Sequence, residues 1–372
     1  MNIAFALFKF FPYGGLQRNM RAMAEEAIKR GHTVTVFCSH WEGDIPSGVK
    51  VWLLPVKKLT NAGRTSAFIG LLLDTLAAQS FDIVVGFNKM PGLDLYYAAD
   101  SCFAYKANYE RGFFYRLSGR TQAYLCNEAA VFGADAKTLI LEVSPRERGK
   151  FQRCYNTPNK RFITLPPGIA RDRALPANFD ALRADLRREI GAKGSDVLML
   201  VLGSGFRTKG LDRAIAVLAE LRQSKLDVAL VVAGQDKSRP FERQAARLQV
   251  RDRVYFLGGR SDVSALLQAA DVLIHPAYKE NTGNVLLEAM IAGKPVVTSD
   301  VCGYAHYVID AAMGYVVEKP YAITAFSQAV KKCIDTPAEH WRELGRRFSM
   351  NDEIYSRPQF AVDVMETLGY RS

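Results

Sequence analysis

The chain has 372 residues, of which 49% are hydrophobic and 23% charged, and its formal net charge is +11 at pH 7. This composition excludes a disordered chain. Because a single hydrophobic core stops growing at roughly 250 to 300 residues, the length predicts two domains. The positive charge is concentrated in residues 1–165, where 21 Lys and Arg accompany 13 Asp and Glu. We expect an anionic partner for this half, or else only a basic surface that aids solubility.

No segment resembles a membrane span or an export signal. Lys9 interrupts the first apolar stretch, and no small-residue cleavage site precedes Pro12. The apolar residues 66–78 are fewer than the roughly 20 that a spanning helix needs. Six scattered cysteines without a CxxC pair indicate neither a zinc site nor a disulfide framework. We therefore expect a cytoplasmic protein.

The first half alternates apolar runs with helical patterns. Residues 2–8 predict a strand, and residues 14–31 predict a helix that begins at a pair of glycines and ends at Gly31. Apolar runs at 32–38, 51–56 and 81–87 predict further strands. Continuous apolar strands that alternate with helices are typical of a parallel sheet buried on both faces.

The same pattern starts again in the second half. Strands are predicted at 196–205, 226–234, 253–259, 271–276 and 295–299, and helices at 210–224 and 262–270. Residues 161–180 contain three prolines and predict a linker. We therefore predict two doubly wound α/β domains that divide near residue 170, with a ligand held between them at the carboxyl ends of strands. Residues 351–370 predict a final helix.

Two carboxylates flank a glycine in residues 279–300. Asn281 or Thr282 is expected to cap a helix from about Gly283 to residue 292, whose first amides attract phosphate. Glu280 precedes this helix and Glu288 lies in its second turn. Because carboxylates near phosphate are repulsive unless they bind hydroxyl groups, the pattern favours a sugar nucleotide. The alternative is that one glutamate complements the helix dipole and the other is a surface residue.

Two glycine-rich turns follow predicted strands. Gly14 and Gly15 begin the first helix, and the turn at 203–210 includes Arg207 and Lys209. Backbone amides and basic side chains in such turns bind phosphate. Neither turn matches GxGxxG or GxxxxGK[ST], which disfavours dehydrogenases and phosphate-loop hydrolases.

Aspartates in an Asp-x-Asp arrangement are missing from the sequence. Many enzymes that use sugar nucleotides hold a divalent ion with this pattern. We predict an enzyme that needs neither a metal nor another cofactor, in which basic side chains and helix amides offset the charge of the leaving diphosphate.

Residues 103–132 interleave aromatic and basic side chains. A helix of this composition can lie on an anionic membrane surface. The alternatives are a half-buried helix with solvated arginines and, less favoured, a surface on which RNA bases stack. We expect the membrane surface as a partner and no nucleic acid.

The spacing of Glu280 and Glu288 is similar to the E-x7-E signature of retaining glycosyltransferases of family 4, which have the GT-B fold. The segments "FKFFPYGGLQRNMR", "LPPGI", "HPAY" and "VCGYAHY" extend the resemblance over nearly the whole chain, to the lipopolysaccharide core glucosyltransferases I within that family. The resemblance implies an acceptor domain at 1–168, to which a helix in 351–372 returns, and a domain at 169–350 that binds the donor.

The resemblance also implies an activity and residue roles. The reaction is transfer of an α-linked hexose from a UDP-sugar to a heptose of the lipopolysaccharide inner core, at the cytoplasmic face of the inner membrane. In the donor domain, the resemblance implies that Glu280 binds hydroxyls of the donor sugar and that Glu288 binds those of the ribose. Lys209 would contact the β-phosphate, and Arg260 would lie near the uracil. The backbone amides of Thr282, Gly283 and Asn284 would contact the diphosphate or the sugar. In the acceptor domain, Gly15, beside Gly14, covers the phosphates, and Asp100, at the end of the strand-like residues 93–100, lies against the reacting sugar. The alternative for Asp100 is a residue that only caps a helix or stabilises a turn.

Departures from the family pattern leave the donor open. Asn19 stands in place of an acidic residue, and Asn281 and Thr282 replace a small apolar pair next to the donor sugar. Glucose or an N-acetylhexosamine such as N-acetylgalactosamine is therefore expected. For the mechanism, we favour attack of the acceptor on the face of the sugar from which UDP departs. The alternative is a covalent intermediate on Asp100. A sugar-nucleotide epimerase, an NAD-dependent enzyme and a basic protein without catalytic activity are the alternative functions.

Overall fold

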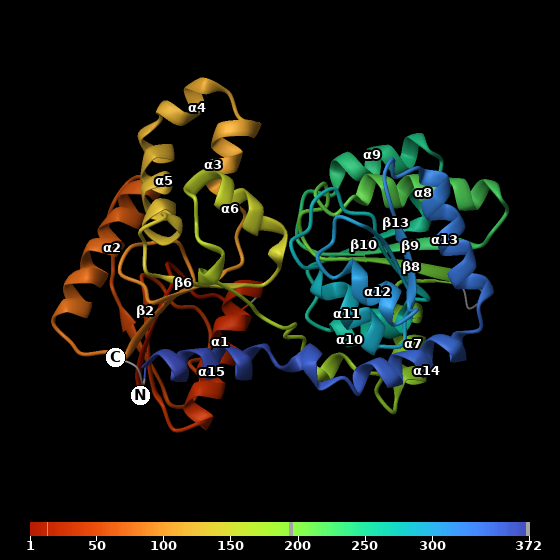
Figure 1. Cartoon of the computed structure of the whole chain (residues 1–372). Helices are drawn as coiled ribbons and strands as arrows, with labels where there is room; N and C mark the ends of the chain where they lie inside the picture. Colours follow the sequence, from red (N-terminus) through yellow and green to blue (C-terminus); the bar gives the residue numbers. More distant parts are fainter. Residues whose placement is uncertain (13, 193–195, 370–372) are drawn as a thin grey trace. The chain divides into compact units, whose positions relative to one another are not determined.

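The structure, a computed structural model, describes residues 1–12, 14–192 and 196–369. These residues form two compact units. Unit 1 comprises Met1–Gly168 and Ser356–Ser372, and unit 2 comprises Ile169–Tyr355. Each unit is a sheet covered by helices on both faces (Figure 1).

Unit 1 contains a seven-stranded sheet in the order β3-β2-β1-β4-β5-β6-β7, and its described strand pairs are all parallel. The strands are β1 (Asn2–Ala6), β2 (Thr33–Cys38), β3 (Val49–Leu53), β4 (Ile83–Gly86), β5 (Leu95–Ala98), β6 (Leu139–Glu142) and β7 (Phe162–Thr164). The helices are α1 (Gly15–Lys29), α2 (Asn61–Ala77), α3 (Phe103–Tyr105), α4 (Phe113–Leu117), α5 (Gly119–Phe132), α6 (Arg148–Tyr155) and α15 (Arg357–Gly369). Apolar clusters on the two faces of the sheet form the core of this unit.

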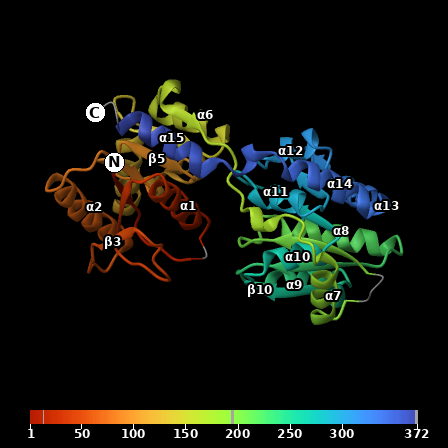
Figure 2. The same cartoon turned by 90° about the horizontal axis from the view of Figure 1, so that it is seen from below.

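The end of the chain belongs to unit 1, because α15 packs against α1 (Figures 1 and 2). Its Ala361, Val362 and Met365 are fully buried in the core of unit 1. The predicted final helix is confirmed from Arg357 onward, but its start is wrong, since a 3-10 turn at Asp352–Tyr355 precedes α15; residue 370 lies outside the described residues. Pro358 lacks an amide hydrogen and is tolerated only in the first turn, which fits a helix that begins at Arg357.

Unit 2 contains a six-stranded parallel sheet in the order β10-β9-β8-β11-β12-β13. The strands are β8 (Val197–Leu202), β9 (Val228–Ala233), β10 (Val254–Gly258), β11 (Val272–His275), β12 (Val296–Ser299) and β13 (Gly314–Val317). The helices are α7 (Phe179–Glu189), α8 (Leu211–Gln223), α9 (Arg239–Arg247), α10 (Val263–Ala269), α11 (Asn284–Ile291), α12 (Ala305–Asp310), α13 (Ile323–Asp335) and α14 (Ala338–Ser349). Two apolar clusters again fill the faces of the sheet.

The fold prediction of two doubly wound α/β domains is confirmed. The short strands β6, β7 and β13 were not predicted, and β7 lies inside the proposed linker at 161–180. β7 has only three residues, which is too short to display a period, and its extended conformation depends on pairing with β6.

The predicted helix over 103–132 is also wrong, because this segment is divided into α3, a π-helical turn at Lys106–Glu110, α4 and α5. Gly112 and Ser118 have extended backbone conformations that interrupt the helical path. The Ser118 hydroxyl then accepts a hydrogen bond from the Thr121 amide and caps α5. None of the described helices has the length and apolarity needed to span a bilayer.

Each sheet has one position where the strand order reverses. It lies between β1 and β4 in unit 1 and between β8 and β11 in unit 2. Ligands of doubly wound sheets bind outside the carboxyl ends of the strands at such positions. The loops after these four strands are therefore where a ligand site is expected.

Candidate functional site

In unit 2, the loop after β8 is shaped by three glycines with positive φ, namely Gly203, Gly205 and Gly210. A Cβ on Gly210 would lie 2.0 Å from the carbonyl oxygen of Pro276, so the close approach of this loop to the loop after β11 requires glycine. The Tyr278 amide donates to the Thr208 carbonyl at 2.9 Å and joins the same two loops. Arg207 is exposed and Lys209 is half-buried.

These loops bring Lys209 and Glu280 together, with the Lys209 ammonium donating to Glu280 Oε2. The two residues follow the two strands that flank the reversal of strand order in unit 2. The Glu280 side chain is 12% exposed, so its charge is compensated inside the protein rather than by bulk water. The structure thus joins two predicted site residues that stand 71 positions apart in the chain.

His275 is a third member of this cluster that the sequence interpretation did not select. It is the last residue of β11, is 1% exposed, and its Nε2 lies 3.2 Å from Glu280 Oε2. Its backbone carbonyl accepts from the Thr298 hydroxyl at 3.0 Å. The only signal in the sequence was a histidine five residues before a glutamate at the end of a strand, which does not by itself indicate a contact.

Electrostatics keep Glu280 ionised. Burial raises its pKa, but the hydrogen bond to His275 and the charge of Lys209 outweigh burial and bring the pKa to about 2. Burial is also the main influence on His275, whose pKa falls below its usual value despite the nearby carboxylate. A neutral imidazole beside an ionised carboxylate must donate through Nε2, so Nδ1 is the unprotonated nitrogen. That Nδ1 is buried and has no hydrogen-bond partner among the described residues.

The helix after Glu280 begins close to the predicted position but is capped differently. Helix α11 spans Asn284–Ile291, its N-cap is Gly283 with φ of 86°, and no side chain caps it, so the predicted capping by Asn281 or Thr282 is wrong. Glycine takes the cap because the left-handed conformation is costly for other residues. The Asn284 Oδ1 atom is buried without a partner among the described residues, and Glu288 lies half-buried in the second turn.

Arg260 follows β10 at the same edge of the sheet. Its guanidinium donates to Asp262 at 2.8 and 2.6 Å and to Glu189 at 2.5 and 3.2 Å, and the hydrogen bonds to Asp262 and then Glu189 raise its pKa. The side chain is therefore fixed by two carboxylates. A nucleobase bound at this position would contact an arginine side chain that is already oriented.

The unit 1 candidates follow β1 and β5. Helix α1 has Gly14 as its N-cap, with no side-chain cap, and Gly15 as its first residue. A Cβ on Gly14 would overlap Gln17 Oε1 at 1.8 Å, whereas one on Gly15 would meet nothing within 4 Å. Asp100 comes two residues after β5 and is exposed. The amides at the start of α1 and the Asp100 carboxylate thus belong to the same, carboxyl edge of the sheet.

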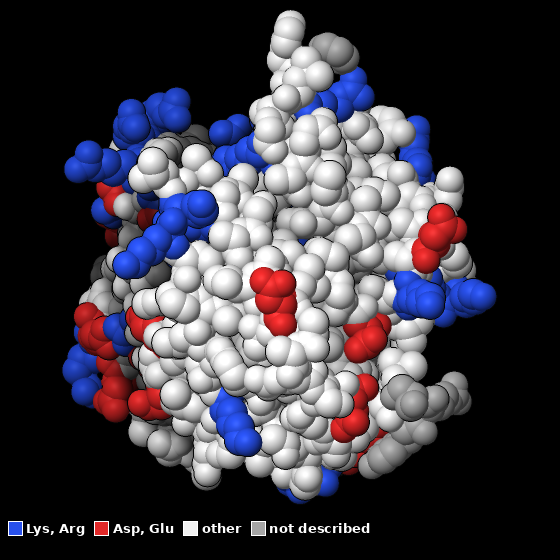
Figure 3. Space-filling model, turned by 90° about the vertical axis from the view of Figure 1, so that its left-hand side faces the viewer, with Lys and Arg blue, Asp and Glu red and all other residues white. Residues whose placement is uncertain are grey.

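The short helix α4 carries exposed apolar side chains, with exposed fractions of 84% for Phe114 and 62% for Leu117. Arg116 lies between them and Arg120 follows at the start of α5. At the top of Figure 3, where α4 lies in Figure 1, uncharged side chains protrude and Lys and Arg side chains lie close by. This part of unit 1 combines apolar and basic groups on one exposed surface.

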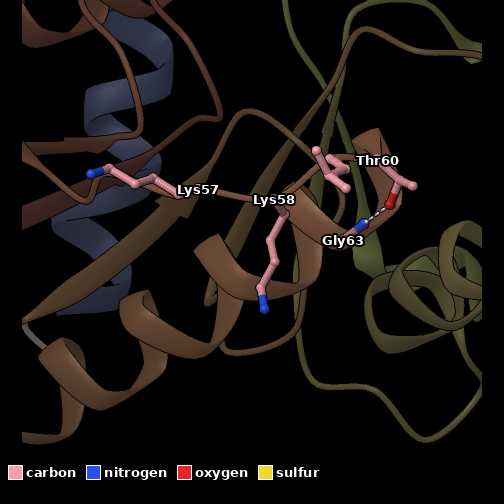
Figure 4. Close-up of a pocket in the computed structure, with 5 residues that line it drawn as sticks. Lys57, Lys58, Thr60 and Gly63 are labelled. Carbon is pink, nitrogen blue, oxygen red and sulfur yellow. Dashed lines mark hydrogen bonds between the residues drawn. The ribbon is translucent and has the colours of Figure 1, made fainter.

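A pocket of roughly 560 Å³ lies between β3 and α2, lined by Lys57, Lys58, Leu59, Thr60 and Gly63. Figure 4 shows the two lysine side chains extending in different directions. The Gly63 amide already donates to the Thr60 hydroxyl at 3.1 Å. The polar groups therefore do not converge on one ligand, and none of the predicted site residues lines this pocket. Among the described residues, no group of three His, Cys, Asp or Glu could hold a metal ion.

Comparisons with known proteins agree with this arrangement. Residues 13–173 match the model of Glycosyltransferase Family 4, and residues 183–351 match that of Glycosyl transferases group 1. The chain is 42% identical to the lipopolysaccharide glucosyltransferase WaaG of Escherichia coli K12 over 368 residues, which cover 98% of each chain.

Solved structures show the same similarity. A crystal structure of WaaG superposes with a TM-score of 0.87 at 42% identity and covers 98% of this chain and 99% of that one. The Anabaena protein Alr3699/HepE, solved with UDP and glucose, has a TM-score of 0.74 at 18% identity over 99% of this chain and 100% of that one, and it supports the fold alone. These results decide against the epimerase, the NAD-dependent enzyme and the protein without catalytic activity. The chain belongs to the glycosyltransferases of family 4, has two Rossmann-like domains of the GT-B type, and is a glycosyltransferase.

Proposed function

We propose that the protein transfers an α-linked hexose from a UDP-sugar to a heptose of the lipopolysaccharide inner core, with retention of configuration. The donor binds unit 2 at the reversal of strand order, and the acceptor binds unit 1. Support for this donor and acceptor comes from the 42% identity to the lipopolysaccharide glucosyltransferase WaaG over 98% of the chain.

The observation that carries the proposal is the buried cluster of Lys209, Glu280 and His275. Without donor, the ammonium and the carboxylate neutralise each other. A UDP-sugar brings negative phosphates and neutral hydroxyls. Lys209 then exchanges its bond to Glu280 for one to the β-phosphate, while Glu280 keeps the hydrogen bond from His275 and accepts from hydroxyls of the sugar.

Around this cluster, Glu288 binds the ribose hydroxyls and Arg260, held by two carboxylates, lies near the uracil. The backbone amides of Thr282, Gly283 and Asn284, at the uncapped start of α11, contact the diphosphate or the sugar. Arg207 is available for additional pairing with phosphate, and the uncapped amides beside Gly14 and Gly15 in unit 1 offer a second contact for phosphate.

Departure of UDP develops positive charge on the sugar and negative charge on the β-phosphate. Lys209 stabilises the negative charge. The acceptor hydroxyl attacks the face of the sugar from which UDP departs, and the leaving phosphate oxygen takes the proton of that hydroxyl. Asp100 lies against the reacting sugar and stabilises its positive charge. Each of these steps proceeds without a metal ion, because the charge on the leaving diphosphate is offset by Lys209, Arg207 and helix amides.

The donor sugar is glucose or an N-acetylhexosamine. Asn281 and Thr282 are half-buried beside Glu280, and the Asn281 amide donates to Glu280 Oε1 at 3.1 Å. The side-chain amide of Asn281 and the hydroxyl of Thr282 offer hydrogen bonds that a small apolar pair would not, and they suit an N-acetyl group on the sugar.

The lipid-linked acceptor calls for an enzyme that binds the cytoplasmic face of the inner membrane. The exposed Phe114 and Leu117 of α4, together with Arg116 and Arg120, have the apolar and cationic character that an anionic lipid surface attracts. We infer that residues 103–132 form the membrane-binding surface of a peripheral, cytoplasmic enzyme.

The test is a screen of UDP-glucose, UDP-galactose and the two UDP-N-acetylhexosamines against a heptosylated inner-core acceptor, with the product linkage determined by NMR. We expect transfer from one of these donors and an α linkage. A β linkage would contradict retention. If no donor supported transfer by a folded protein that binds UDP, the proposed acceptor would be wrong.

A further inference from the structure

Asp100 is exposed in the loop between β5 and α3, so its position depends on how the backbone that follows it is held. Three charged side chains from three different elements bind this backbone. Lys89, from the loop after β4, donates to the Ser101 carbonyl at 2.8 Å. Glu147 accepts from the Cys102 amide at 3.0 Å, and Glu128 of α5 accepts from the Phe103 amide at 2.8 Å.

Glu128 is the centre of this network. Its side chain is fully buried, and its carboxylate also accepts from the Ala104 amide at 2.7 Å and from the Tyr155 hydroxyl at 2.9 Å. Lys89 donates to it at 2.5 Å, so the buried charge is compensated. A carboxylate buried at this depth is costly unless it is paired and hydrogen-bonded, and its bonds to Phe103, Ala104 and Lys89 all tie it to the segment after Asp100.

A second observation ties the network to Asp100. The Tyr96 hydroxyl on β5 is buried and has no hydrogen-bond partner among the described residues. Burial, followed by the charges of Asp100 and Glu128, raises the pKa of this tyrosine. Asp100 and Glu128 thus both lie close enough to the Tyr96 hydroxyl for their charges to act on it.

We propose that Glu128, together with Lys89, is a positioning residue for Asp100 in the transfer reaction, because it fixes the backbone of residues 101–104 from inside unit 1. This inference rests on the proposed function, in which Asp100 lies against the reacting sugar. It assigns to the buried part of residues 103–132 a role separate from the exposed part that binds the membrane.

The experiment compares Glu128→Gln, Asp100→Asn and the double variant. Loss of the Glu128 charge loosens the loop and moves Asp100, and a displacement of about 1 Å lowers kcat on the order of 100-fold. UDP affinity stays unchanged, because the donor binds unit 2. In the Asp100→Asn background the further loss from Glu128→Gln disappears, since a group that acts through Asp100 has nothing left to position.

A matched control is Arg161→Gln. Arg161 is 5% exposed and donates to the carbonyls of Thr138 and Gly133, just beyond the C-terminal end of α5, and neither bond involves residues 101–104. We expect this variant to lower the melting temperature but to combine additively with Asp100→Asn. Hydrogen exchange of the amides of residues 101–104 should accelerate in Glu128→Gln and stay unchanged in Arg161→Gln.

Lys89→Gln is the second variant, because it removes the bond to the Ser101 carbonyl from a side chain that is 12% exposed. It should show the same dependence on Asp100. Unchanged kcat in both folded variants, or an equal loss with and without the Asp100 carboxylate, would overturn the inference. A wild-type protein that transfers no hexose from any donor would instead contradict the proposed function.

Discussion

Glu280 illustrates how one residue acquires its chemistry from its neighbours. A glutamate in a loop is ordinarily solvated, yet here a buried histidine, a lysine from another loop and the next amide all bind its carboxylate. The side chain is held in one orientation before any ligand arrives. Such preorganisation lowers the cost of orienting it when the donor binds.

We predict that Glu280→Gln abolishes transfer while UDP still binds. The amide retains the shape of the side chain but has no charge and one acceptor oxygen fewer, so its bonds to Lys209 and to the hydroxyls of the sugar are weaker. Calorimetry with UDP and a transfer assay separate the two effects.

Glu288→Ala is the matched comparison, from the same segment. Loss of a charged hydrogen bond to the ribose, about 1.5 to 3 kcal/mol, should weaken UDP roughly 10-fold or more. Wild-type turnover in Glu280→Gln, or wild-type UDP affinity in Glu288→Ala, would show that the role assigned to that residue is wrong.

Glu280 also predicts a pH dependence of stability. Its pKa is about 2 in the folded protein against 4.5 as a free side chain, so its ionised form stabilises the fold by about 3 kcal/mol. Because the folded pKa is the lower one, this contribution is fully present above pH 4.5 and is lost as the pH falls toward 2. Urea unfolding of the wild type and Glu280→Gln between pH 7 and 3 should give a stability difference that shrinks below pH 4.5. A difference that does not depend on pH would contradict the assigned pKa.

At the scale of elements, the segment from α3 to α5 is divided by Gly112 and Ser118 into short pieces. The consequence is that α4 stands with Phe114 and Leu117 exposed, whereas Glu128 on α5 is buried in the unit. In one continuous helix, the exposed Phe114 and Leu117 and the buried Glu128 would all lie along the same helix axis. The breaks separate an exposed surface from a buried polar network.

We predict that Arg116→Glu with Arg120→Glu weakens binding to anionic vesicles, at about 1 kcal/mol for each basic charge removed. Phe114→Ser with Leu117→Ser should weaken binding to the same vesicles, because it removes apolar side chains that would be buried in the bilayer on binding. Co-sedimentation with anionic and with neutral vesicles is the measurement. Met350→Ser is the control, because Met350 is 79% exposed but belongs to unit 2. If all variants sedimented with the vesicles as the wild type does, residues 103–132 would be a half-buried helical segment whose arginines are solvated, and not a membrane-binding surface.

At the scale of the whole molecule, the charge is +11, and the basic excess is greatest in the first 165 residues. Both substrates of the proposed reaction are anionic, as is the membrane surface that carries the acceptor. Basic side chains can therefore attract both substrates and offset the charge of the leaving diphosphate. In the proposed reaction, protein cations perform the task that a divalent ion performs in other transferases.

Metal independence is the corresponding prediction. Transfer measured in EDTA should equal transfer in Mg²⁺ or Mn²⁺ once ionic strength is matched. Complete loss in EDTA that added Mg²⁺ restores would show that a metal ion takes part in the reaction.

The class of fold could be read from the sequence alone, because apolar strands buried on both faces have a pattern that survives without tertiary contacts. It also indicated Glu280, Glu288 and Lys209, since glycines and helix starts next to strands mark the carboxyl edge of a sheet. Short strands such as β7, the breaks around α4 and the choice of Gly283 as the N-cap of α11 were decided by tertiary structure. Pairing, burial and the left-handed cap at Gly283 outweigh local preference there.

The contacts of the site were likewise decided only in three dimensions. His275 and Glu128 have no local signature, since a histidine at the end of a strand and a glutamate inside a helix are ordinary in any sequence. Each becomes distinctive once the fold removes it from water and places a charged partner within hydrogen-bonding distance. Burial makes the unpaired state of a polar group costly, and which groups pair depends on strand order, which a linear sequence does not display.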